Sequence, residues 1–140
     1  MSDFRITSDG NEQDIQEIYE MLKIFNLSNR EESENVPLGV FLEDENKKKL
    51  AGITGETFGN WLCIHYFFVD EQLRGQGIGK KMLEAAESEA QKRGCKYSFV
   101  DTFSFQAPGF YEKQGYKEVF TLEDYPYTGK RHYYTKELNQ

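Results

Sequence analysis

The order of hydrophobic and polar residues predicts short strands interspersed with amphipathic helices. Apolar residues recur at helical spacing from Ile15 to Phe25 and from Ile78 to Ala90. Asn11 stands where the N-cap of the first helix is expected, and Gly94 stands where the second helix should end. Apolar runs predict strands at residues 4–7, 38–43, 50–58, 61–69, 97–102, 116–122 and 132–138, with a short third helix between Pro108 and Gly115.

The segment around residues 61–102 gives the clearest topological prediction. Its first strand, Trp61–Val69, is almost continuously apolar, which is typical of a strand covered on both faces. A helix and a further strand follow, and this order favours a parallel pair joined by a crossover. With hairpins on either side, the pattern predicts one mixed sheet that has helices on its faces.

Length and composition narrow the class of protein. A chain of 140 residues with 38% hydrophobic and 29% charged residues is typical of one globular domain. It has neither the roughly 20 consecutive apolar residues of a membrane span nor a signal peptide. Its two cysteines, Cys63 and Cys95, have no metal-binding spacing. The composition therefore favours a cytoplasmic protein with no membrane segment and no metal.

The charge is unevenly divided along the chain. The net charge is −7, but residues 1–70 hold 6 Lys and Arg against 14 Asp and Glu, whereas residues 71–140 hold 11 against 10. An acidic chain without a basic tract argues against nucleic acid as the main partner.

Three alternating glycines between a buried strand and a helix form the most informative motif, in the segment Arg74–Lys81. Such a loop leaves backbone N–H groups uncovered at a helix N-terminus, which favours phosphate oxygens. A P-loop would need glycine at position 74 and Ser or Thr at position 81, and a dinucleotide-binding fingerprint would need glycine at position 80. The chain has Arg74, Lys81 and Lys80 there, so both of these motifs are excluded.

The segment Phe68–Leu83 resembles the coenzyme-A signature of the GNAT superfamily of N-acetyltransferases. A second family motif follows at the right distance, as Ala107–Tyr116. The resemblance covers essentially the whole chain and implies a single GNAT-type domain over residues 1–140. It further implies an α/β fold (α+β in some schemes), with a mixed central sheet of about six to seven strands flanked by helices and a splay between the fourth and fifth strands.

The same resemblance implies acetyl-CoA as co-substrate. Backbone amides of the glycine loop would bind its pyrophosphate, and Phe68 and Val69 would pair with the pantetheine arm. Many relatives have an asparagine seven residues before the catalytic tyrosine; this chain has Ser104 there, so either Ser104 or Gln106 makes that contact. The implied cofactor-binding residues are Phe68, Val69, Arg74, Gly75, Gln76, Gly77, Ile78, Gly79, Lys80 and Ser104.

The resemblance places the general acid at Tyr111, where a phenol could protonate the departing thiolate. Core packing beside Phe110 is the competing interpretation of this tyrosine. The general base is less clear, because His65, Glu56, Glu71 or a chain of water molecules could take the proton of the amine.

Acidic and aromatic residues suggest where the acceptor binds. Glu31, Glu32 and Glu34 follow the first helix, which walls the acceptor side in GNAT folds, so a cationic amine such as a polyamine, an aminoglycoside or a lysine-like group is expected. Tyr125, Tyr127 and His132 either line the acceptor pocket or belong to a plain hairpin. Two other functions stay open: an acyl-CoA-binding sensor without turnover, and transfer to a protein or peptide. Homodimers are common in the family.

Overall fold

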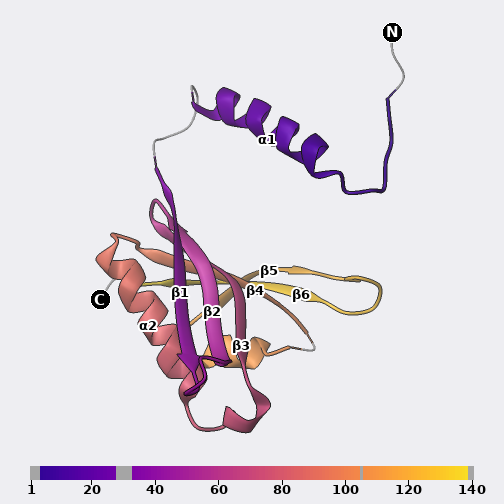
Figure 1. Cartoon of the computed structure of the whole chain (residues 1–140). Coiled ribbons are helices and arrows are strands. Elements are labelled where there is room, and N and C mark those ends of the chain that lie inside the picture. The colour runs from indigo at the N-terminus through magenta and orange to yellow at the C-terminus, as the bar shows by residue number, and fades with distance from the viewer. Residues whose placement is uncertain (1–3, 28–32, 105, 139–140) are drawn as a thin grey trace. The chain divides into compact units, whose positions relative to one another are not determined.

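The computed structural model describes residues 4–27, 33–104 and 106–138. The chain divides into two compact units, Met1–Glu32 (the N-terminal unit) and Ser33–Gln140 (the C-terminal unit). The N-terminal unit contains α1 (Glu12–Leu27). The described part of the C-terminal unit contains six strands together with α2 (Ile78–Lys92) and α3 (Pro108–Lys113) (Figure 1). None of the helices in the described ranges has the length and apolar character that a bilayer span requires.

The N-terminal unit contains one long helix, α1 (Glu12–Leu27), as its hydrophobic spacing predicts. The side-chain oxygen of Asn11 accepts a hydrogen bond from the backbone N–H of Asp14 at 3.1 Å, which confirms the predicted N-cap. The predicted strand at residues 4–7 is wrong, since these residues pair with no described strand. Alternation alone does not make a strand, because a lone extended segment has no ladder partners for its N–H and C=O groups.

Two antiparallel hairpins build the first half of the sheet, from β1 (Asn35–Glu43), β2 (Lys49–Phe58) and β3 (Trp61–Val69). In the first turn, the Asp44 carboxylate accepts the backbone N–H groups of Asn46 and Lys48 at 2.8 and 2.9 Å. In the second turn, Gly59 has a φ of +58°, a conformation that favours glycine.

The second half of the sheet consists of β4 (Tyr97–Phe103), β5 (Lys117–Leu122) and β6 (Arg131–Glu137). The strand order is β1-β2-β3-β4-β6-β5, and of the strand pairs in the described ranges only β3–β4 is parallel. The six strands fall within the predicted number. Because no strand forms at residues 4–7, the predicted fourth and fifth strands are β3 and β4.

The predicted splay between these two strands is confirmed. β3 and β4 pair only from Trp61 opposite Tyr97 to Cys63 opposite Phe99. Beyond that point the strands separate, so the remaining two thirds of β3 and the end of β4 border an opening in the sheet.

A β-bulge at His65 changes the orientation of the rest of β3. Thr54 of β2 pairs with Tyr66, but the next residue of β2 pairs with Ile64, so His65 is an extra residue. Ile64 before the bulge is buried, whereas Phe67 and Val69 after it pack against the same core. Without the bulge, strict alternation would turn Phe67 away from the core.

The core of the C-terminal unit lies between the sheet and α2 (Ile78–Lys92). Leu83, Ala86 and Ala90 of this helix are almost fully buried, and they face β-strand residues such as Ile53 and Leu62, both fully buried. Burial of one such leucine or isoleucine side chain contributes about 1.5–3 kcal/mol. β3 itself is covered on this face, while Tyr66 and Phe68 on its other side are exposed within the unit.

A buried polar network also connects α2 to the sheet. The Glu87 carboxylate of α2 accepts a hydrogen bond from Lys136 Nζ at 2.9 Å and one from the Tyr116 hydroxyl at 2.8 Å. The same hydroxyl lies 2.8 Å from Ser98 Oγ. Because each of these polar groups has a partner, the network satisfies the desolvated carboxylate and fixes the helix against β4 and β6.

Candidate functional site

The glycine loop between β3 and α2 has the backbone conformation that its sequence predicts. Gly75 and Gly77 have φ angles of +80° and +78°, and no atom lies within 4 Å of a Cβ placed on either. Glycine is therefore needed here for its conformation and not for space. No side chain caps α2 at Gly77, so the first N–H groups of the helix stay available to a ligand.

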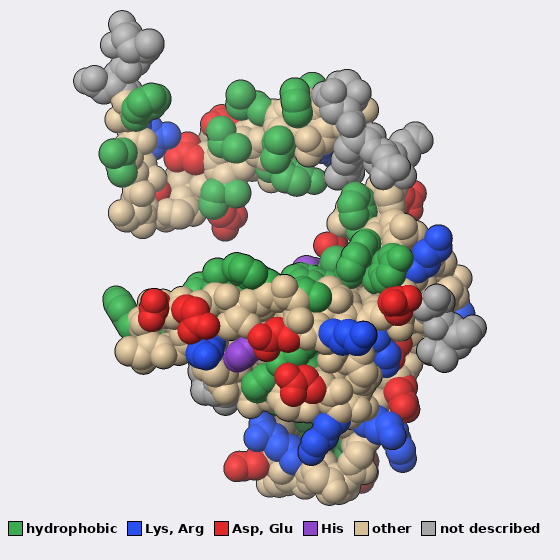
Figure 2. Space-filling model, turned by 180° about the vertical axis from the view of Figure 1, so that it is seen from behind, with side chains coloured by type: hydrophobic (Ala, Val, Ile, Leu, Met, Phe, Trp, Pro, Cys, Tyr) green, Lys and Arg blue, Asp and Glu red, His purple; other side chains and the backbone are tan. Residues whose placement is uncertain are grey.

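Basic side chains surround this loop. Arg74, Lys80 and Lys81 are exposed, and Figure 2 shows Lys and Arg side chains gathered at the lower end of the C-terminal unit, where the loop lies. Arg74 is ordered by its contacts, because its Nε donates to the Val69 carbonyl at 3.1 Å and its guanidinium lies 5.5 Å from the centre of the Phe68 ring. The loop combines open amides with positive charge, which suits a phosphate group.

A cavity of about 730 Å³ runs from this loop to α3 (Pro108–Lys113). It is lined by Phe67, Phe68, Val69, Leu73, Arg74, Gly75, Gly77, Ile78, Gly79, Lys80, Gln106, Ala107, Phe110, Tyr111 and Gln114. The lining includes most of the residues predicted to bind the cofactor.

Two predicted cofactor residues, Gln76 and Ser104, are not among the cavity residues. The Gln76 side chain bonds back to the Gln72 carbonyl at 3.3 Å, and Ser104 Oγ accepts the Lys130 backbone N–H at 3.2 Å. Gln106 does line the cavity. Its side-chain oxygen accepts bonds from Thr102 and from the Phe103 backbone N–H, at 3.0 and 2.7 Å, and these bonds fix the amide group at the cavity wall.

Sequence reasoning missed Phe67 as a cavity residue. Only the bulge at His65 turns its ring toward Phe110 and Tyr111, at centroid distances of 5.7 and 6.3 Å. No residue type in this strand signals a bulge, so an alternating pattern could not reveal it.

Tyr111 lies on α3 at the cavity wall and is 7% exposed. Its ring contacts Phe67 and Phe110, and it stacks on Tyr134 at 6.1 Å. Burial raises the pKa of Tyr111 to about 12, and the nearby charge of Asp101 acts in the same direction. The phenol is therefore neutral at physiological pH and carries a proton that it can donate.

His65 and Glu56 form a pair on neighbouring strands, with His65 Nε2 3.6 Å from Glu56 Oε2. Neither residue is among those that line the cavity. Cys63 lies beside them, and burial, with the charge of Glu56, raises the pKa of its thiol. A raised pKa disfavours the thiolate that a cysteine nucleophile would need.

Strand register places these groups on the face of the sheet opposite α2. Glu56 pairs with Cys63, and Cys63 pairs with Phe99, so all three share one face. Asp101 lies two residues beyond Phe99 and therefore faces the same way. His65 and Asp101 thus stand on the two sides of the opening, just past the last β3–β4 pair.

The predicted acceptor residues are dispersed. Glu31 and Glu32 lie outside the described residues. Tyr125 stacks on Phe103 at 5.5 Å, and Tyr127 is 85% exposed. His132 lies on the face of β6 opposite to Arg131, and its Nδ1 is 3.0 Å from Glu118 Oε1. The structure therefore does not bring His132 together with Tyr125.

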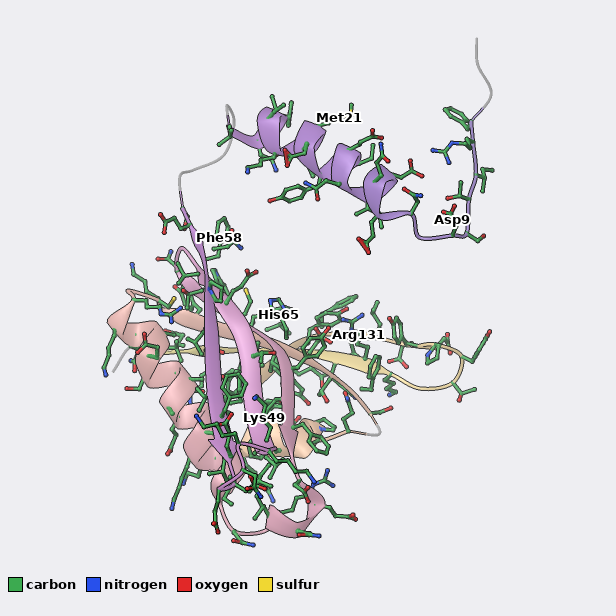
Figure 3. All side chains as sticks on the ribbon, viewed as in Figure 1. Asp9, Met21, Lys49, Phe58, His65 and Arg131 are labelled. Carbon is green, nitrogen blue, oxygen red and sulfur yellow. The ribbon has the colours of Figure 1, made fainter. Side chains whose placement is uncertain are left out.

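Sequence reasoning also missed Arg131. Its Nε donates to Asp101 at 2.9 Å, its Nη1 donates to the Tyr125 hydroxyl at 3.1 Å, and its guanidinium lies between 5.3 and 5.7 Å from the centres of three aromatic rings. Figure 3 labels both Arg131 and His65 on the sheet. Across the described ranges, no group of three or more His, Cys, Asp or Glu side chains could hold a metal ion.

Comparison with known families now adds to this geometry. A family model described as an acetyltransferase (GNAT) domain matches residues 37–118, which is more than half of the chain. The matched range includes the glycine loop, the splay and α3.

Two curated proteins and one solved structure show the same relationship. Acetyltransferase Atu2258 of Agrobacterium fabrum is 35% identical over 105 residues, which cover 75% of this chain and 77% of that protein. Blasticidin-S acetyltransferase of Streptomyces morookaense is 37% identical over 95 residues, which cover 67% and 70%. A crystal structure of an acetyltransferase from Agrobacterium tumefaciens superimposes with a TM-score of 0.91 at 29% identity, over 97% of this chain and 99% of that one. The chain therefore belongs to the GNAT family and is an acyl-CoA-dependent N-acetyltransferase.

Proposed function

We propose that this enzyme transfers the acetyl group of acetyl-CoA to a primary amine on a cationic small molecule, by direct attack within a ternary complex. The observation that carries the proposal is the cavity of about 730 Å³ that joins the glycine loop to Tyr111. Acetyl-CoA needs both features, since it has an anionic phosphate part at one end and a thioester at the other.

The cofactor would bind along the opening in the sheet. Amides from Gly75 to Lys80, at the positive end of α2, would hold the pyrophosphate, with Arg74 and Lys80 adding charge. The backbone of Phe68 belongs to the part of β3 that has separated from β4, so it can pair with the amide groups of pantetheine. Gln106, rather than Ser104, would supply the side-chain amide at the cavity wall.

The chemical step needs a neutral amine and an acid. The amine nitrogen attacks the thioester carbonyl carbon, the C–S bond breaks, and the thiolate takes the proton of the Tyr111 hydroxyl. The thiolate forms in the same poorly hydrated cavity that raises the pKa of Tyr111, so burial raises its proton affinity as well.

A base must remove the excess proton of the attacking amine. The proposed route is the His65–Glu56 pair, acting directly or through water, because it stands at the opening on the face opposite α2. The carboxylate would stabilise the imidazolium that forms when His65 takes the proton.

The acceptor class rests on charge and on one relative. Glu56 stands on the face that borders the opening, and the first half of the chain, which includes Glu31 and Glu32, carries the acidic excess. The name of Blasticidin-S acetyltransferase identifies a small molecule as the substrate of that relative. Tyr125 and Tyr127 are proposed to wall the acceptor, and residues 1–140 are proposed to form one acetyltransferase domain.

The decisive experiment is a thiol-release screen with acetyl-CoA over polyamines, aminoglycosides, amino acids and peptides. The proposal expects a cationic small amine among the substrates, with one thiol released for each acetyl group transferred. If acetyl-CoA raises the melting temperature but no amine releases thiol, the protein is a cofactor sensor. If only peptides react, the acceptor class is wrong.

Tyr111→Phe tests the proposed acid. Loss of a well-placed general acid should lower kcat by about 10²- to 10⁴-fold, while KM for acetyl-CoA changes little. Tyr97→Phe removes a hydroxyl elsewhere on the sheet and serves as the matched control. Unchanged kcat in Tyr111→Phe would show that the tyrosine is only part of the core.

A further inference from the structure

Arg131 is held in one orientation by its surroundings. Its guanidinium makes an ion pair with Asp101 at 2.9 Å and a hydrogen bond to the Tyr125 hydroxyl at 3.1 Å. Its carbon Cζ lies 5.7, 5.4 and 5.3 Å from the ring centres of Phe103, Tyr125 and Tyr133. A long side chain with this many contacts has already lost its rotamer freedom, so a ligand that binds it pays no further ordering cost.

The side chain still has donors to offer. A guanidinium has five N–H donors, and among the described residues its hydrogen bonds use Nε and one hydrogen of Nη1. The Arg131 side chain is 29% exposed, so solvent or a ligand can reach it. A planar fork of N–H groups matches the oxygens of a carboxylate.

Arg131 lies on the same face of the sheet as the proposed base, His65. Arg131 pairs with Phe103, and Asp101 lies on the same face of β4, the face opposite α2. His65 stands across the opening on that same face. From β3 to β6 the sheet spans two strand spacings, roughly 10 Å, and this separation is wider where β3 and β4 diverge.

We propose that Arg131 is a specificity-determining residue that binds a carboxylate on the acceptor. The acceptor then carries a carboxylate in addition to its cationic amine group. The amine lies near His65 and Glu56, and the carboxylate lies several bonds away at Arg131. This inference rests on the proposed function, because it concerns the amine that the enzyme acetylates.

Pairs of amines that differ only in a carboxylate or an amide group test whether Arg131 binds a carboxylate. One pair is 6-aminohexanoate and 6-aminohexanamide, in which an uncharged amide group replaces the carboxylate, and further pairs consist of amino acids and their amides. The wild type should show a kcat/KM about 10- to 100-fold higher for the carboxylate of each pair, the difference expected for a charge-assisted hydrogen bond. Arg131→Gln should remove this preference through a higher KM for the carboxylate member of each pair.

Two further variants separate recognition from folding. Arg131→Lys keeps the positive charge beside Asp101 but loses the planar fork, so the preference should shrink without the loss of thermal stability expected in Arg131→Gln. Lys130→Gln removes a neighbouring exposed charge and should leave the preference unchanged. Equal rates for the two members of each pair, or equal losses for both in Arg131→Gln, would overturn the inference and leave the acetyltransferase proposal intact.

A binding measurement decides the case in which no amine of the panel reacts. In the presence of coenzyme A, 6-aminohexanoate should raise the melting temperature of the wild type, whereas 6-aminohexanamide should not. Arg131→Gln should abolish that shift. If 6-aminohexanoate gives no shift, Arg131 binds no carboxylate, whatever the outcome of the thiol-release screen.

Discussion

Tyr111 holds its proton more tightly than an exposed tyrosine because of where it lies. Its ring is buried among aromatic side chains, and this burial raises the pKa of its hydroxyl to about 12. The family resemblance predicts Tyr111 as the acid from its place in the motif after Pro108, and this role stays a prediction. The pKa could not be predicted from the sequence, since it depends on Phe67 and Tyr134, which come from distant strands.

The raised pKa predicts an alkaline loss of stability. The unfolded tyrosine has a pKa of about 10, so the folded state holds its proton more tightly. The resulting stabilisation is fully present below pH 10 and is lost as the pH rises toward 12. Urea unfolding between pH 8 and pH 12 should show a decline that is smaller in Tyr111→Phe. Identical pH dependence in the two proteins would contradict the burial of the hydroxyl.

A substitution at Gly77 tests the backbone conformation of the glycine loop. A non-glycine residue in the left-handed region costs about 1–2 kcal/mol, so Gly77→Ala should lose that much stability or distort the loop. If the loop distorts, acetyl-CoA must restore its conformation at that cost in binding free energy, which corresponds to an increase in KM of about 5- to 30-fold. Gly109→Ala, whose added Cβ meets no atom within 4 Å at an ordinary φ, is the control and should leave this KM unchanged.

Among the secondary-structure elements, α2 could be predicted well because its apolar residues recur at one face and glycines mark both of its ends. β1 begins at Asn35, three residues before the predicted start at 38, since pairing of Asn35 with Phe58 extends the ladder past the apolar run. The strand expected at residues 4–7 does not form, because these residues have no strand to pair with in the described structure. A local sequence pattern cannot specify such a partner.

The packing of α2 predicts which residues determine the stability of the C-terminal unit. Leu83 is 1% exposed, so Leu83→Ala should leave a cavity and lower the free energy of unfolding by about 2–5 kcal/mol. Glu84 is the next residue and is exposed, so Glu84→Ala should change it by less than about 0.5 kcal/mol. Similar losses in both variants, measured by urea denaturation, would contradict the packing of this helix against the sheet.

In the whole molecule, the division of charge along the chain matches the position of the glycine loop. The acidic excess lies in residues 1–70, while the glycine loop and its basic side chains lie in the nearly neutral second half. The sequence predicted this division and the splay, the latter through the family resemblance. It could not predict that Asp101 and Arg131 would lie on the side of the opening across from His65, because that placement depends on strand register.

Cofactor binding should stabilise the whole C-terminal unit. A ligand that binds only the folded state at 100 times its dissociation constant adds about 2.7 kcal/mol. For a chain of this size, that corresponds to a rise of roughly 5–10 °C in melting temperature. Differential scanning fluorimetry with acetyl-CoA should show this shift, and Gly77→Ala should need a higher concentration for it. A shift of the same size with adenosine alone would argue against binding along the β3–β4 opening.

The separation of β3 from β4 has a consequence for the life of the protein in a cell. Beyond Cys63 and Phe99, β3 and β4 do not pair with each other, and a part of a sheet with few such hydrogen bonds is where local opening and proteolysis begin. A bound pantetheine arm would pair with β3 in this opening as an added strand does. Amide hydrogens of Tyr66–Val69 should therefore exchange more slowly in the complex. The abundance of the enzyme would then follow the supply of its own acetyl donor, because occupied molecules would resist degradation longer than empty ones.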